Sequence, residues 1–229
     1  MTDSCSIDND PTSNLNTASN VFSEGKHVLF FGDPMCSWCW GFAPELNQLS
    51  QRAQGQATFH TIMGGLRPGT TAPWDGEMRD YIRHHWQDVE ARTGQPFDYS
   101  RFEDESFVYD TEPSARALVT VREHDSSQAL RMYEALQRAF YAQNQDITDT
   151  NVLAELAARC GLDTEAFFRT FTSREMHQRV LQDYQQTRTF GIQGFPAVVC
   201  TEDGQYAILT LGYRPYSAMQ SDFEAWLDA

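Results

Sequence analysis

The sequence predicts an α/β protein with a β-α-β / β-β-α core whose two halves are separated by a large all-helical insertion. Three observations favour this architecture. Short apolar runs typical of strands occur only near the two ends of the chain. The long middle has helical periodicity, and the last residues again form an amphipathic helical pattern.

The first half of the core is placed at residues 26–72. It begins with a strand over 27–31, continues with a helix over 38–53, and ends with a strand over 57–63. A strand, a helix and a second strand in this order form a βαβ unit. Pro44 lies inside the expected helix and has no N–H for the carbonyl of Trp40, so we expect a bend there.

The insertion is placed at residues 73–190. Small polar residues that can cap helices precede its apolar patterns. The expected starts are Asp75, Thr111, Ser126, Asp149, Asp163 and Ser173. Gly161 suits the end of one helix, and the last helix should end near Gly191. Residues 94–112 are expected to be a loop or irregular segment.

The second half is placed at residues 191–229. Strands over 197–201 and 206–211 flank Asp203-Gly204, and this dipeptide between two apolar runs indicates a hairpin. A closing helix is expected over 215–227. Together the two halves supply the strands of one four-stranded sheet.

Composition narrows the function classes. The 229 residues carry a formal net charge of −15, which argues against nonspecific nucleic-acid binding. No apolar run approaches the length of a membrane span. Residues 1–25 are expected to be a disordered tail without a secretory signal, so the protein is expected to be cytoplasmic. The pattern does not distinguish a monomer from a homodimer.

The segment Cys36-Ser37-Trp38-Cys39 carries the chemistry. It follows the first strand and opens a helix, where free backbone N–H groups and the helix dipole favour a thiolate. Cys36 is the expected nucleophile, and Cys39, one turn further on, is expected to resolve a mixed disulfide. A structural zinc site would need a second ligand pair, and the sequence has none, so no metal is expected.

The five cysteines are an odd number, which does not suit a framework of structural disulfides. Cys5 falls in the expected tail and is interpreted as a free surface thiol. Cys160 lies on an apolar helical stripe, and Cys200 ends a strand-like run. Both are interpreted as small buried apolar side chains.

Four features together resemble the thioredoxin-like superfamily, and most closely the DsbA-like oxidoreductases. They are the Cys36–Cys39 dithiol at a strand-to-helix corner, Pro44, the segment Gly194-Phe195-Pro196-Ala197 before a strand, and the helical insertion. The segment from Asp33 to Pro44 is similar to a cytosolic branch described as predicted disulfide isomerases. The resemblance covers about residues 26–229. The Ser37-Trp38 dipeptide differs from the Pro-His of the periplasmic oxidant.

The resemblance implies a cis Phe195–Pro196 bond beside Cys36, with the backbone of Phe195 available to an extended substrate. Ser37 and Trp38, together with Phe195 and Pro196, form the expected substrate-binding set. The expected partners are protein or small-molecule thiols and disulfides. No cofactor is expected beyond the redox-active disulfide Cys36–Cys39, with glutathione as a possible co-substrate.

The sequence and the resemblance support three hypotheses about function. The leading hypothesis is a thiol–disulfide oxidoreductase or isomerase that works through a mixed disulfide. The second is a glutathione-dependent transferase or isomerase of the kappa or hydroxychromene-carboxylate isomerase type. Such enzymes normally carry Ser where this chain has Cys36, and they lack the second cysteine, so the complete dithiol argues against them. The third is a non-enzymatic binding module, which would have no reactive dithiol.

Overall fold

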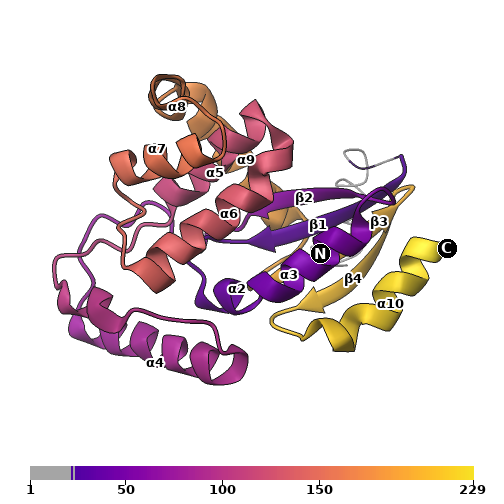
Figure 1. Ribbon diagram of the computed structural model, residues 1–229, viewed down its shortest axis with the longest axis horizontal. Coiled ribbons are helices and arrows are strands. Elements are labelled where there is room, and N and C mark those ends of the chain that lie inside the picture. The colour runs from indigo at the N-terminus through magenta and orange to yellow at the C-terminus, as the bar shows by residue number, and fades with distance from the viewer. Residues whose placement is uncertain (1–21, 23) are drawn as a thin grey trace, which may run out of the picture.

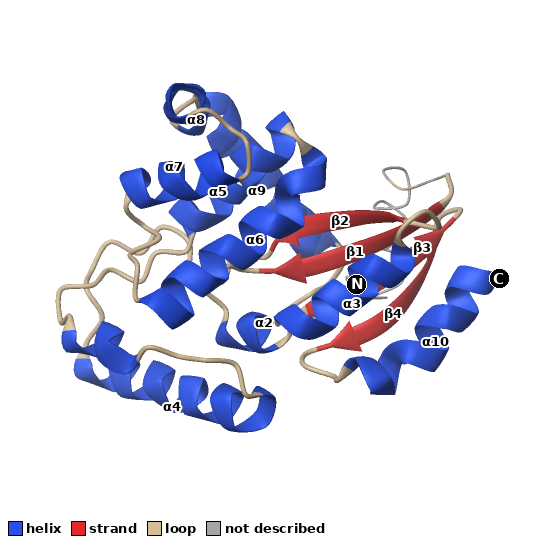
Figure 2. Ribbon diagram, viewed as in Figure 1, coloured by secondary structure: helices blue, strands red, loops and turns tan. Residues whose placement is uncertain are grey.

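The computed structural model describes residue 22 and residues 24–229. Cys5 and nearly all of the expected tail lie outside the described residues. One four-stranded sheet forms the core, in the order β2-β1-β3-β4 (Figure 2). The strands are β1 (Lys26–Gly32), β2 (Thr58–Met63), β3 (Ala197–Glu202) and β4 (Gln205–Leu211). The predicted fold class is therefore confirmed, with two strands from each half of the chain.

The register joins the two halves at the centre of the sheet. β1 pairs parallel to β2 and antiparallel to β3, so Phe31 lies opposite both Ile62 and Ala197. β3 and β4 form the predicted hairpin, and Asp203 and Gly204 both have positive φ angles, 47° and 78°. Positive φ at both central residues is typical of the tight turns that suit the twist of paired strands.

Helices lie beside the sheet and extend well beyond it on one side (Figure 1). The first half contains α2 (Ser37–Gly41) and α3 (Ala43–Ala53), and the chain closes with α10 (Tyr216–Asp228). The segment between β2 and β3 contains α4 (Gly76–Thr93), α5 (Glu112–His124), α6 (Ala129–Gln137), α7 (Thr150–Arg159), α8 (Thr164–Phe171) and α9 (Arg174–Thr189). Short helical turns also occur there, namely η1 (Tyr99–Glu103), η2 (Ser126–Gln128) and η3 (Arg138–Ala142).

Alternate residues of β1 face different parts of the core. Val28 and Phe30 belong to the large cluster that includes α3, α10 and the helical segment. Leu29 and Phe31 belong to a smaller cluster with Phe190, just after α9. All four β1 side chains are fully buried. The central strand is therefore covered on both faces, and its carboxyl end fixes the corner that carries the dithiol.

Pro44 divides the helix that was predicted as one piece. The helix is interrupted at Phe42, which ends α2 and precedes α3. Because Pro44 has no N–H, the carbonyl of Trp40 lacks its usual helical donor. The side-chain amide of Gln95 donates to that carbonyl at 2.9 Å. The expected bend is thus a break, and a side chain from the helical segment compensates for the missing hydrogen bond.

Helix starts in the middle segment follow the predicted residues with two exceptions. Ser126 is only the first residue of the short turn η2, whose cap is Asp125, and α6 begins at Ala129 without a side-chain cap. Asp75, Asp149 and Ser173 accept hydrogen bonds from the first turns of α4, α7 and α9. Thr111 occupies the cap position of α5 but makes no side-chain cap hydrogen bond. Its hydroxyl instead accepts from the N–H of Arg67, while Asp110 accepts from the N–H of Glu112. The expectation that the Thr111 side chain caps α5 was wrong. Its hydroxyl accepts from the N–H of Arg67, in the loop after β2, and not from the first turn of the helix.

Among the described residues, every helix is too short or too polar to cross a lipid bilayer.

Candidate active site around Cys36 and Cys39

The dithiol lies at the corner between β1 and α2. Cys36 is the N-cap residue of α2, and its N–H donates to the carbonyl of Asp33 at 3.0 Å. Cys39 follows one turn later and is fully buried. Cys36 is 7% exposed, which is less than the partial exposure expected from its position. The two thiols therefore differ in access, and Cys36 is the more accessible.

The loop before β3 covers the Cys36 thiol. The Phe195–Pro196 peptide bond is cis, as the family resemblance implies. The thiol of Cys36 donates to the carbonyl oxygen of Phe195, with an S···O distance of 3.6 Å. Pro196 is buried, and its carbonyl accepts from the N–H of Gly212 at 2.7 Å. The structure thus brings Cys36, Phe195 and Pro196 together from opposite ends of the chain.

Burial sets the protonation of Cys39. Desolvation raises the pKa of its thiol well above the usual value, and the neighbouring Cys36 raises it further. Hydrogen bonds from the backbone of Asp33 and the hydroxyl of Tyr133 act in the opposite direction. The neutral thiol of Cys39 is therefore favoured until a reaction step removes its proton.

Asp33 is a site residue that the sequence pattern did not single out. Its carboxylate is fully buried and accepts from the N–H groups of Met35 and Leu66, each at 2.9 Å. Burial raises its pKa to about 6 despite these hydrogen bonds. Asp33 therefore ties the dithiol corner to the loop after β2. Its place directly between a buried strand and the first cysteine is the signal that could have identified it.

Two tyrosines from the helical segment hold the same corner. The hydroxyl of Tyr109 donates to the carbonyl of Met35. The hydroxyl of Tyr133 donates to the carbonyl of Asp33 at 3.0 Å. Both rings are buried. The sequence carried no local signal for these contacts, because 74 and 100 residues separate the partners.

A cavity of about 290 Å³ opens beside Cys36. Its remaining lining residues are Ser37, Trp38, Leu66, Arg67, Tyr81, Ile82, His85, Trp86, Tyr109, Gln193, Gly194 and Phe195. Three of the four predicted substrate-binding residues line it, namely Ser37, Trp38 and Phe195, whereas Pro196 is not among the lining residues. Trp38 and Phe195 are both partly exposed, so each can contact a bound molecule.

A second cavity, of about 490 Å³, shares Trp38 and Phe195 with the first. It is lined by these two residues together with Arg92, Leu211, Gly212 and Tyr213. Trp38 also packs against Tyr213, with ring centroids 6.0 Å apart. The first cavity reaches Cys36, and the second continues from the Trp38 and Phe195 side chains without reaching either cysteine.

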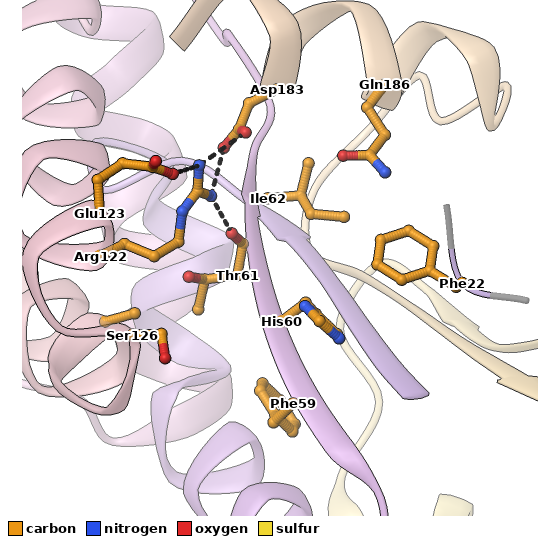
Figure 3. A pocket seen from close by; sticks show the side chains of 11 residues that line it. Phe22, Phe59, His60, Thr61, Ile62, Arg122, Glu123, Ser126, Asp183 and Gln186 are labelled. Carbon is orange, nitrogen blue, oxygen red and sulfur yellow. Dashed lines mark hydrogen bonds and ion pairs between the residues drawn. The ribbon is translucent and has the colours of Figure 1, made fainter. Parts of the chain in front are cut away.

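A further cavity lies away from the dithiol, between β2, α5 and α9 (Figure 3). In this cavity the guanidinium of Arg122 is bound by Asp183 through two hydrogen bonds of 2.8 and 3.0 Å, and it donates to the carbonyl of Thr61. His60 lies at the edge and is hydrogen-bonded to His27 at 3.0 Å. Burial lowers the pKa of His60 to about 4. We interpret this region as a structural contact between sheet and helices.

Comparison with known proteins agrees with this geometry. The model of the family described as DSBA-like thioredoxin domain matches residues 27–224. A protein from Nitrosomonas europaea, provisionally assigned as a protein disulfide isomerase, is 36% identical. Its structure has a TM-score of 0.84, and the match covers 90% of this chain and 98% of that one.

The cytosolic disulfide reductase DsbM from Pseudomonas aeruginosa is 26% identical, with a TM-score of 0.73 and coverage of 88% of this chain and 98% of DsbM. A structure of DsbM with GSH also matches, at 24% identity and a TM-score of 0.71, over 89% of this chain and all of that one. At this lower identity the likeness shows the fold alone.

The curated relatives are named as adapter proteins and not as oxidoreductases. A ClpXP adapter protein SpxH from Halalkalibacterium halodurans is 22% identical, over 93% of this chain and 70% of the relative. The SpxH of Bacillus subtilis is 24% identical over 64% of this chain. This chain spans from about half to 70% of the length of the SpxH proteins it matches.

Proposed function

Because the chain belongs to the family of DSBA-like thioredoxin domains, we propose that it is a thiol–disulfide oxidoreductase that reacts through Cys36 and Cys39. One observation carries this proposal. Cys36 lines a cavity beneath the Phe195 carbonyl, whereas Cys39 is fully buried one turn behind it. An accessible thiol backed by an inaccessible one suits attack followed by internal resolution.

The proposed reaction has two exchange steps. The Cys36 thiolate attacks one sulfur of a substrate disulfide, forms a mixed disulfide and releases the first substrate thiolate. Cys39 then loses its proton and attacks the sulfur of Cys36. The second substrate thiolate leaves, and the Cys36–Cys39 disulfide forms. Two electrons pass from the dithiol to the substrate, and the reverse sequence oxidises a substrate dithiol.

Glutathione is the co-substrate that we propose for recycling the Cys36–Cys39 disulfide. The structure of the related DsbM with GSH supports this choice. We also propose a cytoplasmic location, because DsbM is described as cytosolic. Glutathione keeps cytosolic thiols reduced, so a dithiol there works against a reducing pool. Disulfide reduction is therefore the proposed direction, ahead of isomerisation.

The proposal is tested with two single-cysteine variants. Cys36→Ser should abolish reaction with any disulfide, whereas Cys39→Ser should react once and remain as a stable mixed disulfide. Mass spectrometry of the non-reduced protein separates these results, because the trapped adduct adds the mass of one substrate thiol. Undiminished exchange by Cys36→Ser would exclude the assigned roles.

Protein binding is the second candidate function, and the curated relatives named as adapter proteins motivate it. Exposed apolar side chains at the rim of the cavity are compatible with it, because Leu66 is 45% and Tyr81 is 63% exposed. The variant with Ser at both Cys36 and Cys39 separates the two functions. In cells that lack the protein, this variant should restore function if the protein acts by binding, and it should not restore function if the protein acts by disulfide exchange.

A further inference from the structure

The two cavities beside the dithiol meet at a common wall. Trp38 and Phe195 line both of them. The thiol of Cys36 lies directly under the carbonyl of Phe195. A substrate whose sulfur reaches Cys36 in the first cavity can therefore extend past Trp38 and Phe195 into the second cavity.

Acidic side chains from the described part of the chain are absent from the lining of both cavities. Asp and Glu make up 32 of the 229 residues, about one in seven. By contrast, Glu123 and Asp183 line the cavity next to β2, and Glu202 and Asp203 line a cavity next to β4. The rest of this acidic molecule repels anions, whereas this cleft has no carboxylate to do so.

Each of the two cavities also contains one arginine. Arg67 lines the cavity beside Cys36, and Arg92 lines the cavity beyond Trp38. Within the described part of the chain, neither guanidinium is within ion-pair distance of a carboxylate; the pairs found involve other arginines. The guanidinium of Arg67 donates from Nη1 to the sulfur of Met78 at 3.2 Å.

The backbone of Arg67 is fixed at the rim of its cavity. Its N–H donates to the hydroxyl of Thr111 at 3.1 Å, and its carbonyl accepts from the N–H of Thr111 at 3.2 Å. Arg92 begins from the last turn of α4, which is a regular helix. Both guanidinium groups therefore extend from anchored backbone, while their charged ends stay available to a ligand.

We propose that the cleft selects small thiols and disulfides with carboxylates on both sides of the sulfur, and that Arg67 and Arg92 each bind one carboxylate. This inference rests on the proposed exchange reaction at Cys36. Glutathione has the required chemistry, because its cysteine lies between two residues that each carry a free carboxylate. Arginine binds carboxylates through two parallel N–H donors, which gives orientation as well as attraction.

Single-turnover kinetics test the inference without a recycling partner. The pre-reduced protein is mixed with glutathione disulfide, with the neutral hydroxyethyl disulfide or with the cationic cystamine. In each reaction two electrons leave the Cys36–Cys39 dithiol, the small disulfide becomes two thiols, and the protein disulfide forms. The rate is measured by acid quenching, alkylation and mass spectrometry. Hydroxyethyl disulfide and cystamine are similar in size and differ in charge, whereas glutathione disulfide is both anionic and larger. The change that each arginine variant makes to each of the three rates therefore reports the electrostatics of the cleft.

Arg67→Gln and Arg92→Gln should each slow the reaction with glutathione disulfide by about three- to tenfold. The same variants should change the rate with the neutral disulfide by less than about twofold. Arg67→Lys keeps the charge but loses the paired donors, so its rate should lie between those of the wild type and Arg67→Gln. Arg159→Gln, on α7 and lining neither cavity, is the control for the same change in net charge.

Ionic strength gives a second readout. Added salt should slow the wild type with glutathione disulfide and should affect the Arg67→Gln/Arg92→Gln double variant much less. Equal rates of the wild type with all three disulfides, or a preference for cystamine, would overturn the arginine assignment and leave the exchange reaction intact. A wild type that reacts with none of the three disulfides would instead remove the exchange reaction on which the inference rests.

Discussion

The ring of Phe195 packs directly on Gly64, so that a Cβ atom at position 64 would overlap the ring. Gly64 follows β2, and its N–H donates to the carbonyl of Gly32 at 2.7 Å. The carbonyl of Phe195 accepts from the thiol of Cys36. A glycine in one half of the core therefore sets how closely the loop of the other half approaches the dithiol.

Gly64→Ala should disturb this approach. The added methyl group must displace the Phe195 ring or the backbone, and overpacking of this kind costs about 1–3 kcal/mol in the free energy of unfolding. The reaction of Cys36 with a small disulfide should also become slower, because the carbonyl of Phe195 shifts. Urea denaturation and single-turnover alkylation measure the two effects.

Gly76→Ala is the matched control, because a Cβ at this first position of α4 meets nothing within 4 Å. Its unfolding free energy should stay within about 0.5 kcal/mol of the wild-type value. If Gly64→Ala behaves like this control, the packing of Phe195 on Gly64 does not position the loop.

Asp33 should make the stability depend on pH. Its pKa is about 6 in the folded protein, above the value of about 3.9 expected when unfolded. The raised pKa means that protonated Asp33 favours the folded state. This contribution is fully present below about pH 4 and is lost as the pH rises through about 6, a change of about 2–3 kcal/mol.

The comparison with Asp33→Asn isolates this effect, because asparagine does not titrate. The difference in unfolding free energy between wild type and variant should change by about 2–3 kcal/mol between pH 4 and pH 7, to the disadvantage of the wild type. Urea titrations at several pH values measure it. Parallel stability curves for the two proteins would show that Asp33 does not titrate in this range.

Local sequence signals specified much of the fold. The apolar runs gave all four strands, and capping residues such as Asp149 and Asp163 marked helix starts, because these features depend on neighbours along the chain. Pro44 predicted a disturbance in the first helix for the same reason. The proximity of Phe195 and Pro196 to the dithiol was predicted from the family resemblance. Residue patterns alone gave no reason for that contact.

Long-range partners were not predictable in this way. Helical periodicity predicts a helix in the region of Tyr133, but it does not predict that the Tyr133 hydroxyl would reach Asp33, 100 residues away. The hydroxyl of Thr111 was expected to cap its own helix, yet it binds Arg67. Such contacts depend on how the helices pack against the sheet, which a pattern along one helix does not define.

The buried ion pair between Arg122 and Asp183 should matter for stability. It joins α5 to α9, and the Asp183 carboxylate also accepts from the N–H of Met63 at the end of β2. Asp183→Leu should destabilise the protein by about 3–5 kcal/mol, because the largely buried guanidinium of Arg122 loses its two short hydrogen bonds and keeps only the 3.9 Å pair with Glu123. Chemical denaturation measures the loss.

A double variant tests the origin of that loss. Arg122→Met/Asp183→Leu should recover a large part of the stability, since no uncompensated charge remains. The exposed pair of Arg138 and Glu134 supplies a control, and Arg138→Ala should cost less than about 1 kcal/mol. Additive losses for Arg122→Met and Asp183→Leu would show that the two residues do not interact energetically.

Tyr133 should influence both stability and the resolution step. Its hydroxyl donates to the carbonyl of Asp33, and it lowers the pKa of the Cys39 thiol against the effect of burial. Tyr133→Phe removes both effects. We expect a loss of about 1 kcal/mol in unfolding free energy and a resolution step that needs a higher pH.

The resolution step is measured as the release of the second thiol from a preformed mixed disulfide at Cys36, over a series of pH values. Tyr184→Phe is the matched control, because its buried hydroxyl has no hydrogen-bond partner in the described part of the chain. Its loss should be nearly neutral for stability and should leave the pH profile unchanged. A shift of the profile in Tyr133→Phe alone assigns the effect to the Cys39 contact, whereas identical profiles in both variants would contradict it.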